Sequence, residues 1–156
     1  MRPDLKSAIE NDGFAIVSGV LPDSDIDDLT AALSFSDERE NPAQRRGGRR
    51  NLLDIPAIQE LCGCEAIRNL VEAVLGPNCF ATRGVLFDKT PNANWKVVWH
   101  QDVMIALCER RDAPEFCAWS QKAGVPHAQP PAYILNNMLS VRLHLDSCGE
   151  ENGRCA

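Results

Sequence analysis

The order of helix-like and strand-like segments is the feature that most restricts the fold of this chain. In the first half, apolar residues recur at helical spacing, for example at Ile26, Leu29 and Leu33. Short runs rich in β-branched and aromatic residues follow, mainly in the second half. Helices that precede strands, without regular alternation, predict an α+β protein built around an antiparallel barrel rather than parallel βαβ units.

Local patterns predict the individual elements. Pro22 and Asp23 supply helix-start chemistry, and Gly76 with Pro77 ends the longest apolar stripe. A loop as long as the one expected at 108–131 is often functional in a compact domain. We expect helices over 22–33, from 56 onward, over 65–75 and over 132–138; strands over 13–20, 80–88, 95–99 and 139–145; and loops over 34–51 and 108–131.

The charge of the chain limits its partners. Sixteen Lys and Arg against 22 Asp and Glu give a net charge of -6 in 156 residues. This balance argues against nucleic-acid binding, which needs a basic face to displace counterions. One basic cluster, made of Arg45, Arg46, Arg49 and Arg50, is either a solvated loop or a site for an anionic group of a substrate.

Compartment and redox state follow from apolar runs and cysteines. The sequence contains no run of about 20 apolar residues, the length that a membrane span needs. Its first residues lack the apolar core of a signal peptide. We therefore expect a cytoplasmic protein without membrane contact, with its seven cysteines reduced. Cys62 and Cys64 are spaced too closely for a usual structural zinc site, so core packing is preferred over zinc binding.

The strongest local signal is Trp99-His100-Gln101-Asp102, which follows an expected strand. Residues two apart on a strand share a face, with Cα atoms about 6.7 Å apart. The His100 imidazole and the Asp102 carboxylate can then bind one cation, whereas on a helix they would diverge by about 200°. Two histidines and one carboxylate form the facial triad of non-haem iron(II) oxygenases. The alternative is a strand-end histidine hydrogen-bonded to its neighbour.

Several segments, in the right order, resemble the phytanoyl-CoA dioxygenase family of iron(II)/2-oxoglutarate enzymes. Residues 11–21 are similar to the opening strand of that family as it enters its first helix. Residues 84–102 are similar to the approach to its first two iron ligands, and 141–153 to a later barrel strand and its turn. The Trp-His-Gln-Asp element and the Glu-Asn-Gly turn carry most of the specificity.

The resemblance implies a fold and a chemistry. The fold is a double-stranded β-helix barrel of the jelly-roll or cupin-like kind, with flanking N-terminal helices. The resemblance further implies that His100 and Asp102 bind Fe(II), with 2-oxoglutarate as cosubstrate. Molecular oxygen then hydroxylates a small organic substrate, with release of succinate and carbon dioxide. Lys89 and Arg142 are candidates to bind 2-oxoglutarate, and a solvated side chain is the alternative for both.

Two further histidines are candidates for the substrate pocket. His127 lies in the proline-rich loop, where exposure or a loop hydrogen bond is the alternative. His144 and Asp146 form a second pair at strand spacing and share a face with Arg142. That face points either into the barrel or to ordinary surface.

The chain departs from the family after its Glu-Asn-Gly turn. In the family, a second histidine ligand and a 2-oxoglutarate-binding arginine come later, whereas only residues 154–156 follow here. We expect one incomplete dioxygenase domain over 1–156, with an N-terminal strand and helices in 1–78 and the first part of the barrel in 79–156. It is truncated before the C-terminal barrel strands. We also expect no 2-oxoglutarate turnover, marginal stability and self-association through the open barrel edge. A non-catalytic remnant or interaction subunit is the main alternative, and a cupin-like metal-binding barrel without 2-oxoglutarate is a weaker one.

Overall fold

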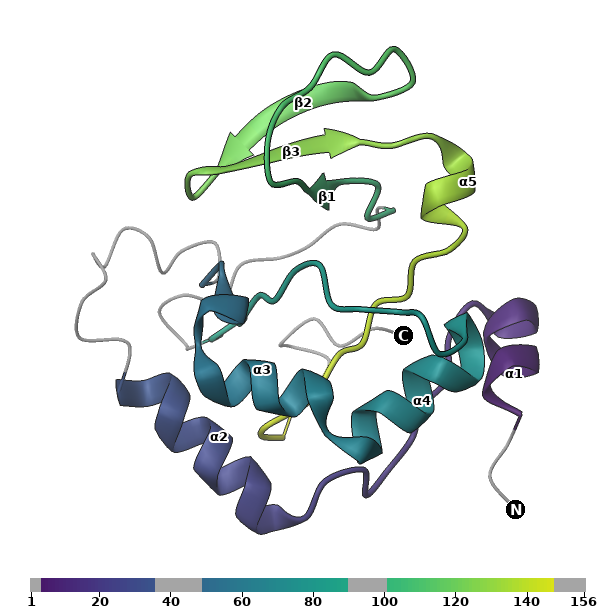
Figure 1. Cartoon of the computed structure of the whole chain (residues 1–156). Helices are drawn as coiled ribbons and strands as arrows, with labels where there is room; N and C mark the ends of the chain where they lie inside the picture. Colours follow the sequence, from purple (N-terminus) through teal and green to yellow (C-terminus); the bar gives the residue numbers. More distant parts are fainter. Residues whose placement is uncertain (1–3, 36–48, 90–100, 148–156) are drawn as a thin grey trace.

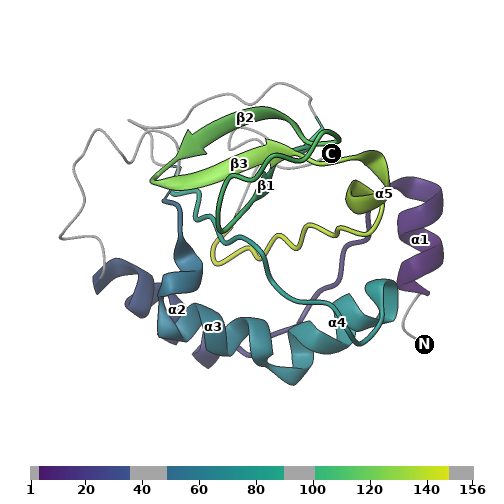
Figure 2. The ribbon, with the colours of Figure 1, turned by 45° about the horizontal axis from the view of Figure 1, so that its top comes forward.

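The chain folds into a mixed α+β structure with two layers. A computed structural model describes residues 4–35, 49–89 and 101–147. Helices α1 to α4 form one layer and a small antiparallel sheet forms the other (Figure 1). Two extended segments, residues 79–89 and residues 138–147, lie between the layers. The turned view in Figure 2 keeps the helices and the sheet on opposite sides of these segments.

Most helices precede the strands along the chain, as the sequence predicts, and the two kinds of element do not alternate as in a βαβ protein. The α-helices are α1 Leu5–Asp12, α2 Asp23–Phe35, α3 Pro56–Gly63, α4 Glu65–Leu75 and α5 Ala132–Leu135, and the 3-10 helix η3 is Leu52–Asp54. The strands are β1 Ile105–Ala106, β2 Cys117–Lys122 and β3 Val125–Gln129. Among the described residues, no helix has the length and apolar character required to cross a membrane.

Helix α1 was not expected from apolar periodicity, and it is defined by its two ends. The Asp4 carboxylate caps it by accepting hydrogen bonds from the Lys6 and Ser7 backbone N–H groups and from the Ser7 hydroxyl. The Ser7 hydroxyl and the backbone donors lower the pKa of Asp4, because they favour its ionised form. Gly13 ends the helix with φ of 81°, the left-handed conformation that glycine adopts without strain.

The apolar core lies within the helical layer. Leu29 and Leu33 of α2 pack with Leu52 of η3 and Ile58 of α3, and all four are buried. Leu143 lies on one of the two extended segments and covers this cluster. These contacts join α2, α3 and the extended segments into one unit, as the helical spacing of the apolar residues predicts.

Helix α4 ends in a turn that one arginine holds. The Arg68 guanidinium donates to the backbone carbonyls of Cys79 at 3.1 Å and Pro77 at 3.2 Å. The same side chain pairs with Glu72 one turn along the helix. Gly76, with φ of 83°, lets the chain reverse at this point, as the Gly76-Pro77 pair predicts.

The sheet occupies a region that the sequence assigned to a loop, so that prediction is wrong. β2 and β3 form a hairpin whose turn residues Ala123 and Gly124 both have positive φ, 48° and 79°. Such a pair suits the twist of a two-residue hairpin. Strand β3 lies between β1 and β2 and carries Pro126, which lacks an N–H donor. Just past the end of β1, the Leu107 N–H donates to the Pro126 carbonyl at 2.9 Å, so the missing donor removes one bond at the end of the β1–β3 pairing.

The strands expected elsewhere are not formed in the described ranges. Residues 13–20 and 139–145 have no strand pairing, and 80–88 pairs only through an isolated bridge between Leu86 and Arg49. β-forming residues are insufficient without a partner strand: Ile16 is 79% exposed. The described strands form an open three-stranded sheet, not a closed barrel. The strand expected at 95–99 lies outside the described residues.

Candidate functional site

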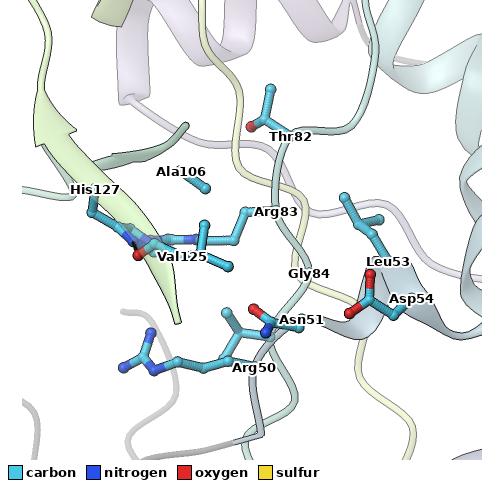
Figure 3. A pocket seen from close by; sticks show the side chains of 11 residues that line it. Arg50, Asn51, Leu53, Asp54, Thr82, Arg83, Gly84, Ala106, Val125 and His127 are labelled. Carbon is cyan, nitrogen blue, oxygen red and sulfur yellow. Dashed lines mark hydrogen bonds between the residues drawn. The ribbon is translucent and has the colours of Figure 1, made fainter. Parts of the chain in front are cut away.

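A pocket of about 200 Å³ lies between the sheet and the segments below it. Engineered cavities of about 150 Å³ hold a benzene molecule, so this space is large enough for a small ligand. Three parts of the chain line it (Figure 3): residues 50, 51, 53 and 54, residues 82–85, and the sheet residues Ala106, Val125 and His127.

The floor of the pocket is held by backbone pairing across segments distant in sequence. Arg49 and Leu86 exchange two backbone hydrogen bonds of 2.8 and 2.9 Å. The Leu52 N–H donates to the Gly84 carbonyl at 3.3 Å. Gly84 is required here because a Cβ atom on it would lie 2.9 Å from the Cβ of Leu52. Close approach of two backbones therefore fixes where residues 82–85 meet the helical layer.

Asn51 links this floor to the sheet. Its φ of 58° is left-handed, a conformation that asparagine tolerates better than most residues. Its side-chain amide donates to the Ala123 carbonyl in the β2–β3 turn at 3.2 Å. The two layers are thus bridged at one end of the pocket by a residue that also lines it.

His127 faces the pocket from the middle of the sheet. In the sheet, His127 lies opposite Ala106 of β1 and Ser120 of β2, and it is 3% exposed. Its Nδ1 lies 2.9 Å from the Val125 carbonyl. A carbonyl only accepts, so this bond requires the proton on Nδ1 and leaves Nε2 for a ligand. The sequence placed His127 in a loop, whereas it belongs to the central strand.

Asp102 lies beside the pocket and pairs with a residue that lines it. The distance from its Oδ2 to Nη2 of Arg83 is 4.0 Å. The Asp102 side chain is 63% exposed and that of Arg83 is 31% exposed. Surface pairs of this kind contribute about 0–1 kcal/mol, so the contact holds Asp102 only weakly.

The other predicted site residues are dispersed. His100 lies outside the described residues, so its convergence with Asp102 stays a prediction. Lys89 is half-buried and, like Arg142, has interactions of its own. Arg142 and His144 are exposed on an extended segment, and neither lines the pocket.

The thiols bear on the zinc alternative. All five cysteines in the described ranges are free. Burial raises the pKa of the Cys62 thiol, and the neighbouring Cys64 adds to the increase. Within these same ranges, no three His, Cys, Asp or Glu side chains are grouped to hold a metal ion.

Sequence reasoning missed Arg83 and singled out Arg50 only as part of a cluster. Arg83 interrupts a run of β-forming residues, a pattern that on its own says little about function. The fold, and not the sequence, distinguishes Arg50 from a solvated residue, because it brings Arg50 to the pocket. Its neighbour Arg49 instead donates to the Leu33 carbonyl at 3.1 Å.

Comparison of the chain with protein-family models, with curated proteins and with solved structures finds no match to any of them.

Proposed function

We propose that the chain carries the metal-ligand pair of an iron(II)/2-oxoglutarate-dependent oxygenase, an enzyme class that hydroxylates small organic substrates, on the first part of a double-stranded β-helix. The observation that carries this proposal is the Trp99-His100-Gln101-Asp102 element, with its His-x-Asp pair, in a chain that resembles this family at several ordered positions. Iron(II) and 2-oxoglutarate would supply the oxygen-activating chemistry.

The surroundings of Asp102 support the proposal. Asp102 lies three residues before β1, and its exposed carboxylate is open to solvent. Its neighbour Arg83 lines the small-molecule pocket. His127 also lines it, from strand β3, which pairs with β1 in the sheet. A cation on Asp102 would therefore lie at the edge of a space that fits a small substrate.

The donor set of the described residues is incomplete for an iron site. Asp102 is a suitable oxygen ligand, and His100 is the proposed nitrogen ligand. The described residues by themselves offer no group of three such ligands, and His100 lies outside them. A two-ligand site holds iron more weakly than the facial triad, which makes metal affinity the first property to measure.

The test is metal binding by the full 156-residue chain. Equilibrium dialysis under anaerobic conditions measures Fe(II) affinity in wild type, His100→Ala and Asp102→Ala. Each substitution should weaken binding at least tenfold, because each removes one ligand. His144→Ala and Asp146→Ala are matched controls with the same His-x-Asp spacing, and they should leave affinity unchanged. Equal losses in both pairs would contradict the assignment.

Turnover is a separate question. We expect the chain to release no succinate from 2-oxoglutarate above background, since a two-ligand site holds iron weakly. Iron-dependent succinate release that disappears in His100→Ala would contradict this expectation. It would mean that another residue of the chain, for example His144, completes the ligand set.

A non-catalytic interaction protein is the second candidate, and exposed apolar side chains favour it. Ile16 and Phe80 are 79% and 81% exposed, and Phe87 is 56% exposed. Apolar side chains that adjoin on a surface often mark a protein interface, and Phe80 and Phe87 lie on the same segment. Specific Fe(II) binding that depends on His100 and Asp102 would argue against this candidate.

A further inference from the structure

The pocket gathers two arginines and a histidine from three different parts of the chain. Arg50 precedes η3, Arg83 lies on the extended segment, and His127 lies on β3. In Figure 3 the side chains of Arg50 and Arg83 extend to the same side of Gly84, the side on which β3 and His127 lie. Two guanidinium groups thus face a strand that carries a ring nitrogen.

The acidic residue of the pocket lies elsewhere. Asp54 is the carboxylate among the lining residues, and Figure 3 places it with Leu53 on the opposite side of Gly84. Arg83 has Asp102 as a partner only at 4.0 Å, with that carboxylate largely in solvent. Within the part of the chain that the structure describes, no ion pair is formed by Arg50. The described residues therefore neutralise the positive charge on this side of the pocket only weakly.

The hydrogen bond of His127 adds a requirement. Because Nδ1 donates to the Val125 carbonyl, Nε2 of the neutral ring is an acceptor. Such a nitrogen favours a ligand hydroxyl and disfavours a bare charged oxygen. The guanidinium groups, in contrast, favour charged oxygens, which they bind through paired N–H donors.

We propose that this pocket binds a small oxyanion that carries a hydroxyl group beside its charged oxygens. Hydrogen phosphate and a 2-hydroxycarboxylate share this chemistry. Arg50 and Arg83 bind the charged oxygens, and Nε2 of His127 accepts from the hydroxyl. The space of about 200 Å³ accommodates such a ligand. This site needs no metal, so it stands or falls separately from the proposed oxygenase activity.

Binding to the metal-free full chain tests the proposal. Isothermal titration at constant ionic strength uses inorganic phosphate, lactate and acetate as probes. Phosphate, lactate or both should bind at least fivefold more tightly than acetate, which has no hydroxyl. Binding of phosphate alone assigns the site to phosphate groups, and binding of lactate alone assigns it to hydroxy acids. Acetate binding as tight as both would overturn the proposal, as would the absence of binding by any probe.

Substitutions assign the binding to these residues. Arg50→Gln and Arg83→Gln should each weaken the preferred probe about tenfold, the effect of losing one charge-assisted hydrogen bond. His127→Asn keeps a donor near the Val125 carbonyl but removes Nε2, so it should abolish the preference over acetate. Arg111→Gln is the control, because Arg111 is exposed and pairs with Glu109 outside the pocket. Affinities unchanged in all three pocket variants would refute the assignment.

Chemical protection gives a readout that does not depend on how well the variants fold. Phenylglyoxal modifies accessible arginines of the wild-type chain, and peptide mass spectrometry locates the adducts. The preferred probe should slow modification of Arg50 and Arg83 at least threefold and leave Arg111 unaffected. Equal protection of Arg111, or no protection of the pocket arginines, would contradict a site at this position.

Discussion

Replacement of Gly84 by alanine should destabilise the protein, although glycine-to-alanine changes at unstrained positions usually stabilise proteins. An alanine Cβ would lie 2.9 Å from the Leu52 Cβ and 3.6 Å from the Leu53 backbone nitrogen. Carbon atoms pack best about 3.5–4.0 Å apart, so one of the two segments has to shift. The Leu52 atom is a Cβ close to the backbone, and Leu52 is buried in the core, so no flexible side chain can relieve the overlap.

The magnitude follows from two opposing effects. Overpacking of this kind costs about 1–3 kcal/mol. The loss of backbone freedom in the unfolded chain returns about 0.4–1 kcal/mol. The net loss in the free energy of unfolding should therefore be about 1–2 kcal/mol. Gly63→Ala is the matched control, since nothing lies within 4 Å of its Cβ position, and it should gain about 0.4–1 kcal/mol.

Urea unfolding followed by circular dichroism measures both variants. We expect Gly84→Ala and Gly63→Ala to fall on opposite sides of the wild type. For a chain of this length, a difference of about 2 kcal/mol corresponds to about 4–8 °C in Tm. A Gly84→Ala protein as stable as the wild type, beside a normally behaved Gly63→Ala, would refute the close approach of residues 82–85 to η3. It would also remove the floor of the proposed anion pocket.

Three other outcomes follow from single residues. Arg68→Ala should lower the free energy of unfolding by about 1–2 kcal/mol, because it frees the turn after α4; the exposed Arg111→Ala should change it by less than about 0.5 kcal/mol in the same urea experiment. Cys62 should react with iodoacetamide more slowly than exposed cysteines, with its rate rising only at higher pH, because burial raises its pKa. The same raised pKa means that the folded state loses stability as pH rises through the thiol range and keeps it below that range; a fast Cys62 reaction at neutral pH would contradict the burial. Phe80→Asp should reduce concentration-dependent association in analytical ultracentrifugation, since Phe80 is 81% exposed, and a monomeric wild type would remove the basis for that expectation.

The helices could be predicted from the sequence because their signals are local. The apolar residues of α2, α3 and α4 recur at helical spacing, and Pro56 and Gly76 stand at helix ends as expected. Helix α1 was missed because its apolar periodicity is weak. Its signals were the Asp4 cap and the Gly13 end, which enclose eight residues.

The sheet could not be predicted because its signals conflict. Pro126 and Pro130 argued for a loop, yet Pro126 lies in β3 just past its pairing with the two-residue β1, where its missing donor affects only the end of that pairing. The turn at Ala123 and Gly124 is less distinctive than an Asn-Gly pair. Residues 139–145, in contrast, alternate as a strand does, and Leu143 does face the core. Alternation reports which face is buried, but a strand also needs a partner, and that information is not local.

The site was predictable only where a motif carried it. Asp102 was chosen from its spacing to His100; its Oδ2 lies 4.0 Å from Nη2 of Arg83, which lines the pocket, and its role as a metal ligand stays a prediction. The pocket itself depends on Gly84 meeting Leu52, a contact between residues 32 positions apart in the sequence. No local pattern announces such a contact, so Arg83 could not have been assigned to the site beforehand.

Arg83 connects the two proposals made for this protein, and its geometry limits how strongly they affect each other. The arginine lies 4.0 Å from Asp102 and also lines the pocket, so an anion that draws it into the pocket separates Arg83 from Asp102. An exposed pair of this kind contributes at most about 1 kcal/mol, which corresponds to about a fivefold change in an equilibrium constant. Anion and metal should therefore each tighten the binding of the other by no more than about fivefold, because such coupling is reciprocal. Arg83→Gln should raise metal affinity within the same limit while it weakens anion binding about tenfold, and dialysis with either ligand measures this. A drop in metal affinity in Arg83→Gln would mean that the arginine positions Asp102 for the metal instead of competing for it.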